Sequence, residues 1–170
     1  YGVQPGTEFP NKKYIICAHF DDMPSGTTAP GADDNGSGTA AVIEAARIFS
    51  QYSFPFTIVY ALWDEEEQGL VGSDYYATQA ANAGDSILGV INMDMIAYDG
   101  NNDGNADVHT SSIANTSSLK DKMLEINLAY VQGQLKDSVV DLENWNRLTA
   151  KADKFGGLYI YKDNIRVLPY

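Results

Sequence analysis

The first part of the chain contains three short runs of hydrophobic residues, each bounded by charged or turn-forming residues. Runs of this length without polar interruption are typical of strands that are buried on both faces of a sheet. The three runs cover residues 14–18, 57–63 and 88–93. We therefore expect three largely buried strands in the first half of the protein.

Two segments between these runs have the spacing of helices. In the first, Ser37 is in position to cap a helix, and hydrophobic side chains recur every three to four residues up to Phe49. The second covers residues 73–83 and stops before Gly84, a residue suited to the left-handed conformation at a helix end. The order strand, helix, strand, helix, strand predicts an α/β fold with a largely parallel sheet.

After residue 94 the pattern predicts a polar loop, a short strand, a third helix and a pair of strands. Asn115 or Thr116 is expected to cap the helix. The four elements are expected, in this order, at residues 99–107, 108–110, 116–134, and 157–161 with 165–168.

Composition limits the classes of partner. The chain of 170 residues has 11 lysine and arginine residues against 23 aspartate and glutamate residues, which gives a net charge of −12. Such a balance argues against nucleic acid or an anionic membrane as a partner and is compatible with bound cations. The single cysteine, Cys17, lies in a hydrophobic run and is expected to be a small buried residue.

The chain carries no recognisable targeting or membrane-spanning segment. No hydrophobic stretch is long enough to cross a bilayer, and no signal peptide is recognisable. The sequence opens abruptly at Tyr1, as if cut from a longer protein, and we expect truncation at both ends.

Polar side chains with metal-binding chemistry follow each of the three predicted strands. His19 and Asp21 come after the first strand, a run of glutamates at 65–67 follows the second, and Asp94 ends the third. In open α/β sheets the ligand site lies beyond the carboxyl ends of the strands, so these side chains are expected to meet. The loop after the first strand adds Asp33 and Asp34 to this group.

One imidazole among several carboxylates is a ligand set for zinc or a similar divalent ion. Two neighbouring ions would account for the excess of acid, because one carboxylate can bridge them while another handles protons. The alternative for the glutamate run alone is a solvated loop, since most charge runs face water.

Four motifs occur in order over about residues 14–110: "AHFDD", "APGADDNGSG", "WDEEEQGLVGS" and "INMDM". Together they resemble the motifs of the co-catalytic zinc aminopeptidases, a family that includes bacterial leucyl aminopeptidase-type enzymes and glutamate carboxypeptidase relatives. The resemblance implies a three-layer α/β/α architecture with helices on both faces of the sheet. Residues 1–135 would then form a partial catalytic core.

The resemblance implies a set of metal ligands. Carried over motif by motif, His19 and Asp94 resemble ligands of one zinc ion, and Asp34 resembles the carboxylate that bridges it to a second. Glu67 resembles a ligand of that second ion. Two zinc ions are therefore expected if the site is complete, and one if it is not.

The same resemblance implies a mechanism and a substrate class. Glu66 resembles the general base that takes a proton from a water held between the metals and passes it to the leaving amine. Asp21 resembles the carboxylate that orients the histidine ligand. The expected substrate is a peptide or protein with a free amino terminus, and relatives of this type lead us to expect a secreted or extracytoplasmic protein.

The chain departs from the family pattern at one ligand, a histidine expected well downstream on the Glu67 side. The only other histidine, His109, lies fifteen residues past Asp94, where a histidine on a structural strand is expected. Without that ligand the second ion would have only Asp34 and Glu67. A relative without catalytic activity, acting as a metal-binding domain, is the alternative function.

The last part of the chain, residues 136–170, does not match the family and is treated as an unassigned tail. The stretch "GGLYIYKDNIRVLPY" faintly resembles a strand-turn-strand segment of histidine-kinase-type ATPases, although no nucleotide-binding motif accompanies it. An ordinary amphipathic hairpin is the other interpretation, and a composite chain is a third.

A second ion site is suggested by the loop "DGNNDGNAD", which resembles a calcium loop with oxygen ligands at alternating positions and glycine in sixth place. A turn rich in asparagine, aspartate and glycine that binds no ion is the alternative. The candidate ligands are Asp99, Asn101, Asp103, Asn105 and Asp107.

Overall fold

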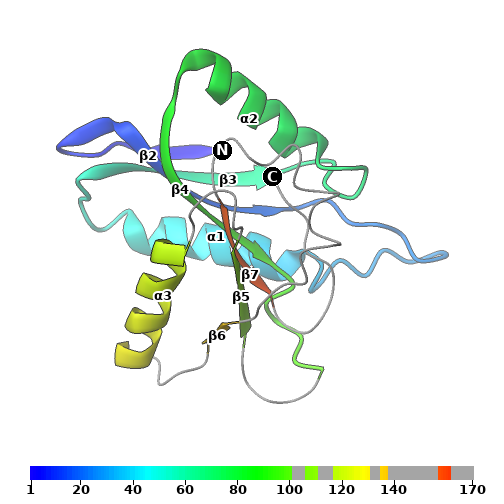
Figure 1. Ribbon diagram of the computed structural model, residues 1–170. Coiled ribbons are helices and arrows are strands. Elements are labelled where there is room, and N and C mark those ends of the chain that lie inside the picture. Colours follow the sequence, from blue (N-terminus) through cyan, green and yellow to red (C-terminus); the bar gives the residue numbers. More distant parts are fainter. Residues whose placement is uncertain (101–105, 111–116, 131–134, 138–156, 162–170) are drawn as a thin grey trace.

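The computed structural model describes residues 1–100, 106–110, 117–130, 135–137 and 157–161. These residues form one sheet and three helices (Figure 1). The elements are β1 (Gly2–Gln4), β2 (Phe9–His19), α1 (Gly36–Phe49), β3 (Phe56–Trp63), α2 (Val71–Ala83), β4 (Ser86–Asp94), β5 (Ala106–Thr110), α3 (Ser117–Tyr130), β6 (Leu135–Asp137) and β7 (Gly157–Tyr161).

The sheet has seven strands in the order β1-β3-β2-β4-β7-β5-β6. The pairs β2–β3, β2–β4, β4–β7 and β5–β6 are parallel, whereas β1–β3 and β5–β7 are antiparallel. The predicted α/β fold with a mostly parallel sheet is therefore confirmed. The edge strand β1 was not predicted, because three residues are too few to carry an alternating pattern.

One hydrophobic cluster lies on each face of the sheet. On one face, side chains of α1 such as Val42 pack on Ile58 and Tyr60 of β3. On the other face, Tyr76 of α2 packs against a cluster that includes Cys17 and Trp63. Figure 1 shows α1 and α2 on opposite sides of the central strands, so the helices lie on both faces as expected.

The ends of α1 and α2 can be compared with the helix caps predicted from the sequence. α1 is capped by Asn35, whose side chain accepts a hydrogen bond from the Gly38 N–H, so the prediction that Ser37 caps this helix is wrong. A capping residue stands just before the first helical residue, which is the position of Asn35, whereas Ser37 lies inside the helix. α2 ends at Ala83 and is followed by its cap Gly84, which has a φ of +69°, as predicted.

Two of the later strands agree with the sequence pattern, whereas β6 (Leu135–Asp137) was not predicted. β5 contains the predicted strand at 108–110, and β7 coincides with the predicted strand at 157–161 and lies between β4 and β5 in the sheet. The helix cap at 115–116, the strand at 165–168 and the calcium-loop positions 101–105 lie outside the described residues. The division of the chain at residue 135 stays a prediction.

None of the helices that the structure describes is both long and apolar enough to cross a membrane.

Candidate metal centre

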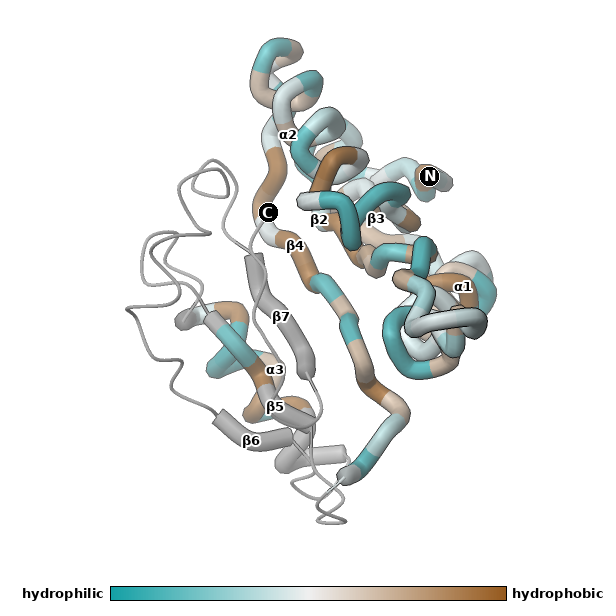
Figure 2. The backbone as a smooth tube through the Cα atoms, turned by 90° about the vertical axis from the view of Figure 1, so that its right-hand side faces the viewer, coloured by the Kyte–Doolittle hydropathy of each residue, from teal (hydrophilic) through white to brown (hydrophobic). Residues whose placement is uncertain are grey.

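The site forms where two neighbouring parallel strands end. His19 is the last residue of β2 and Asp94 is the last residue of β4, and the two strands pair directly. The hydrophobic residues of β4 give way to hydrophilic ones toward its carboxyl end (Figure 2). Both side chains are buried, with 2% of His19 and 7% of Asp94 exposed. Parallel pairing thus brings an imidazole and a carboxylate to the same edge.

The loop before α1 adds the second carboxylate. Nε2 of His19 lies 3.2 Å from Oδ1 of Asp34 and 3.5 Å from Oδ1 of Asp94. The donor atoms of these three residues all lie within 4.8 Å of one another. One side chain nitrogen therefore faces two carboxylates drawn from separate segments of the chain.

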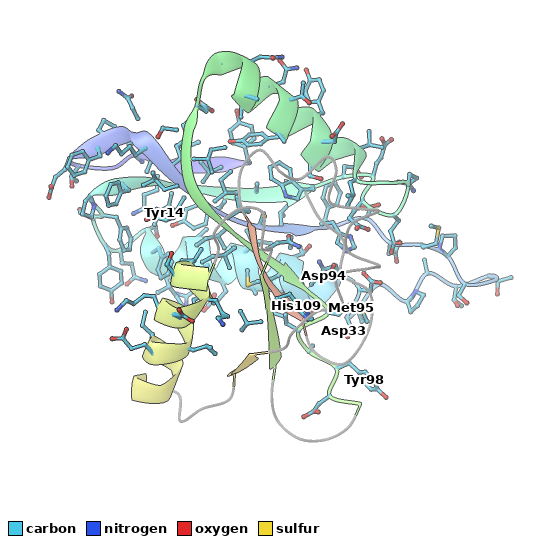
Figure 3. All side chains as sticks on the ribbon, in the orientation of Figure 1. Tyr14, Asp33, Asp94, Met95, Tyr98 and His109 are labelled. Carbon is cyan, nitrogen blue, oxygen red and sulfur yellow. The ribbon has the colours of Figure 1, made fainter. Side chains whose placement is uncertain are left out.

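The adjacent carboxylate, that of Asp33, has a different use. Its Oδ1 accepts hydrogen bonds from the N–H groups of Ala97 and Tyr98, at 2.9 and 3.1 Å. Figure 3 shows Tyr98 on the segment that continues beyond Asp94, with Asp33 between the two in this view. Of the two consecutive aspartates, Asp33 holds the segment after β4 while Asp34 faces His19.

The other ring nitrogen of His19 is engaged by Asp21. Nδ1 lies 3.1 Å from the main-chain oxygen of Asp21 and 3.5 Å from its Oδ1. A carbonyl oxygen only accepts, so Nδ1 carries the proton in this contact. Nε2 is then the nitrogen with a lone pair available to an ion, and it is the one that faces Asp34 and Asp94.

The glutamate run bends over the same edge of the sheet. The N–H groups of Glu66 and Glu67 both donate to the carboxylate of Asp21, at 3.1 Å each. Glu65 has a φ of +56°, which turns the chain so that consecutive glutamates face different surroundings. Glu66 is buried, with 8% exposed, whereas Glu65 faces solvent.

Burial and like charges make Glu66 a weaker acid. Desolvation by burial raises the pKa of Glu66 to about 7, and the charges of Asp94 and Glu67 add to the effect while His19 opposes it. The pKa of Glu67 is raised as well, first by burial and then by the charge of Asp34. A carboxylate with a pKa near neutrality is well placed to exchange protons.

The carboxylates around His19 raise the pKa of its imidazole. Burial lowers its pKa, but hydrogen bonds with Asp34 and Asp94 and the charges of Asp94 and Glu66 raise it to about 11. Without a metal, the ring of His19 therefore carries a proton on Nε2 as well as on Nδ1 at neutral pH. A cation in the same place would take over the role of the Nε2 proton.

A cleft of about 480 Å³ is lined by one of the three donor residues, Asp34. It combines carboxylates with hydrophobic side chains from the loop before α1 and from the segment after β4. It is lined by Met23, Pro30, Gly31, Ala32, Asp33, Asp34, Glu67 and Tyr98.

The donor set fits zinc. A buried imidazole with its second nitrogen fixed by a carbonyl, together with two carboxylate oxygens, is the chemistry that zinc sites use. His19, Asp34 and Asp94 form such a donor set, which we call the metal group. Among the described residues, Glu67 is not part of this group. His109 lies on β5, opposite Tyr159 of β7, and is likewise outside that group.

The sequence profile of peptidase family M28 matches residues 2–152 of the chain. The chain belongs to peptidase family M28. In a match of 109 aligned positions that covers 61% of this M28 chain, it is 38% identical to a probable zinc metalloprotease of Pyrenophora tritici-repentis. The match covers 25% of that protein, so the chain spans about a quarter of the relative's length.

Solved structures share the fold of this M28 chain. A zinc aminopeptidase from Bacillus subtilis matches 99% of the chain with a TM-score of 0.74 and 19% identity, and the match covers 41% of that protein. An aminopeptidase from Aneurinibacillus sp. strain AM-1 matches 96% with a TM-score of 0.74 and 20% identity, and 39% of it is covered. The predicted family and architecture are therefore confirmed.

Some residues that shape the site were missed by the sequence reasoning. Asn35 and Thr39 both hydrogen-bond to the main chain of strand ends, to Met93 in β4 and to His19 in β2. The motif "DDNGSG" contains Asn35, but spacing alone assigned it no contact. The main-chain role of Asp33 could have been suspected, because two adjacent aspartates in a loop seldom share one task.

Proposed function

We propose that the chain is the metal-binding core of a zinc-dependent peptidase that hydrolyses peptide bonds next to a free amino terminus. The observation that carries this proposal is the meeting of Nε2 of His19 with Oδ1 of Asp34 and Oδ1 of Asp94. Membership of family M28 and the similarity to a probable zinc metalloprotease support it.

In this proposal His19, Asp34 and Asp94 hold one zinc ion. When bound, zinc supplies a Lewis acid that polarises the substrate carbonyl and makes water more acidic. Asp21 keeps the proton of His19 on Nδ1 through its carbonyl oxygen, 3.1 Å away. Asp94, buried at the end of β4, keeps its carboxylate directed at the imidazole.

Glu66 is the proposed general base. Its carboxylate accepts a proton from the attacking water and returns it to the nitrogen of the departing amine, so that the base becomes the acid of the second half-reaction. Its pKa of about 7 in the metal-free site falls when positive charge is added nearby, which keeps it ionised at neutral pH.

The proposed substrate is a peptide with a free amino group. The cleft beside the metal group is bordered by Asp34 and Glu67, whose negative charges favour a substrate ammonium group. Met23 and Tyr98 offer hydrophobic contact in the same cleft. Aminopeptidases of similar fold support this substrate class, and secretion of the whole protein stays a prediction.

We propose that this chain binds one zinc ion tightly and a second one weakly. The first ion has the imidazole of His19, whereas a second ion would rely on the carboxylates of Asp34 and Glu67. Zinc binds less well to carboxylates alone than to a set with imidazole. This difference favours, as the alternative function, a metal-binding domain without turnover.

Metal counting followed by an activity assay tests the proposal. The purified chain is saturated with zinc and dialysed, and its metal content is measured by elemental mass spectrometry. We expect one zinc per chain, lost in Asp94→Ala and kept in Glu44→Gln, which alters a carboxylate paired with Arg47 on the exposed side of α1.

The same samples are then assayed for release of an amino-terminal residue from an aminoacyl anilide, with and without a chelator. Turnover that needs zinc would support the peptidase. Bound zinc without turnover would support the metal-binding domain, and a chain that retains no zinc would contradict both functions.

A further inference from the structure

The first turn of α1 makes hydrogen bonds with the ends of both strands that carry the metal group. Asn35, the cap of the helix, contacts the end of β4, and Thr39, one turn later, contacts the end of β2. The hydroxyl of Thr39 donates to the main-chain oxygen of His19 at 2.9 Å. The helix therefore touches both strand ends at main-chain atoms.

The side-chain amide of Asn35 makes three hydrogen bonds. Its Nδ2 donates to the Met93 carbonyl at 3.0 Å, and its Oδ1 accepts from the N–H groups of Gly38 and Met95, at 3.0 and 3.4 Å. Only 1% of the residue is exposed. A buried amide with these contacts fixes the main-chain segments that it joins, because any shift would leave polar groups unpaired.

The residues joined by Asn35 are the direct neighbours of two carboxylates in the metal group. Asn35 follows Asp34 in the chain, and Met93 and Met95 stand on either side of Asp94. Asp34 is about half exposed at its side chain, 48%, so packing alone holds it only partly. The amide of Asn35 thus connects two carboxylates that repel each other when no cation lies between them.

We propose that Asn35 and Thr39 are positioning residues for the metal, with Asn35 setting the separation of Asp34 and Asp94 and Thr39 setting the position of His19. The proposal rests on the proposed function in that it takes these three residues as the zinc ligands. Neither residue contacts the ion, and each acts through the main chain of a ligand or its neighbour.

The test must separate positioning from helix capping. Asn35→Ser keeps a good capping residue for the Gly38 N–H, but its side chain is too short to reach Met93 and Met95. Thr39→Val removes only the hydroxyl that donates to His19 and keeps the shape of the side chain. Zinc affinity of each variant is measured by competition with a chromophoric chelator.

Gln4→Ala is the matched control. Gln4 also uses an amide for three hydrogen bonds, to the carbonyls of Phe49 and Tyr52 and to the Tyr60 hydroxyl, at the other end of α1. This variant lowers stability by loss of a comparable network without touching the strand ends of the metal group.

We expect the zinc dissociation constant of Asn35→Ser to rise about tenfold or more, as for other residues that orient metal ligands. The absorption spectrum of the cobalt-substituted chain should change in Asn35→Ser and stay as it is in Gln4→Ala. Thr39→Val should weaken zinc binding without a change in helix content.

Three results would overturn the inference. A wild-type zinc affinity in Asn35→Ser would do so, and so would an equal loss in Gln4→Ala, because the effect would then come from stability alone. If Asn35→Ser does not fold, an unchanged affinity in Thr39→Val is the result that contradicts it. Absence of zinc binding by the unaltered chain would instead contradict the proposed function, and this inference with it.

Discussion

The carboxylate of Asp21 accepts a hydrogen bond from the main-chain N–H of Glu66 at 3.1 Å, and its second oxygen accepts one from Glu67 at the same distance. Its main-chain oxygen accepts from Nδ1 of His19. A single residue therefore joins the proposed metal group to the loop of the proposed base. This is a wider role than the orientation of one histidine that the family resemblance implies.

Replacing Asp21 by asparagine should weaken both functions of the site. An amide keeps one oxygen acceptor but turns an NH₂ group toward a main-chain N–H, so one partly buried donor loses its partner at a cost of about 1–3 kcal/mol. We expect a lower midpoint of thermal unfolding and a zinc-dependent turnover reduced about tenfold or more. Calorimetry and the anilide assay measure the two effects.

The adjacent aspartate offers the control for this variant. Asp22→Asn removes the same charge one position later and leaves the contacts of His19, Glu66 and Glu67 in place. Equal losses in Asp21→Asn and Asp22→Asn would mean that charge in this loop, and not the hydrogen bonds of Asp21, is responsible.

Replacing Glu66 by glutamine should separate metal binding from proton transfer. The amide has nearly the same size as the carboxylate but cannot take a proton, so we expect zinc content to stay at the wild-type level while kcat falls about 10²–10⁴-fold. Metal analysis and steady-state kinetics give both quantities. Glu65→Gln, at the neighbouring exposed position, should leave both unchanged; turnover retained in Glu66→Gln would exclude this residue as the base.

The sequence was informative about the fold where each element had a local signal of its own, such as a hydrophobic run, helical spacing or a glycine at a helix end. The three central strands, the helix that ends at Phe49 and the stop at Gly84 are all found in the structure. β1 was missed because it is an edge strand of three residues, held by antiparallel pairing with β3. Such a strand depends on its neighbour, and the neighbour cannot be read from local pattern.

Part of the candidate site was predictable as a set of residues, since His19, Asp34 and Asp94 meet while Glu67 is outside that group among the described residues, but its distances were not predictable. The rule that polar residues gather beyond strand ends placed His19 and Asp94 at one edge, and they do meet there. That Asp33 bonds to main-chain N–H groups while Asp34 faces His19 depends on the path of the loop, which spacing does not give. Hydrogen bonds from side chain to main chain, such as those of Asn35, are equally hidden from the sequence.

Metal-free protein should become less stable as the pH rises above neutrality. His19 has a pKa of about 11 in the folded state against an ordinary value of 6.5, so its contribution is complete below about pH 6.5 and is lost as the pH approaches 11. Glu66 acts in the same direction at lower pH, because its folded pKa of about 7 lies above its ordinary 4.5.

Urea unfolding between about pH 7 and about pH 9 measures this slope in chelator-treated protein. His19→Gln should lack most of it, and zinc-loaded wild type should lack it too, because binding zinc displaces the proton from the imidazole. A slope of the same size in His19→Gln would show that other groups cause the loss of stability.

Replacing Gly38 by alanine should destabilise the protein although alanine is the better helix former. In an exposed helix interior this exchange stabilises by up to about 1 kcal/mol. At Gly38, a Cβ would collide with Oδ1 of Asn35 and with the Met93 carbonyl, which accepts the hydrogen bond that Nδ2 of Asn35 donates to the end of β4. We expect the overpacking to lower the free energy of unfolding by about 1–3 kcal/mol and to weaken zinc binding, since the helix must move away from β4.

Gly2→Ala, whose Cβ would meet nothing within 4 Å, is the control and should be neutral in both measurements. A Gly38→Ala variant as stable as wild type would mean that α1 and β4 can separate without cost, and that the close approach of this helix does not hold the ligands in place.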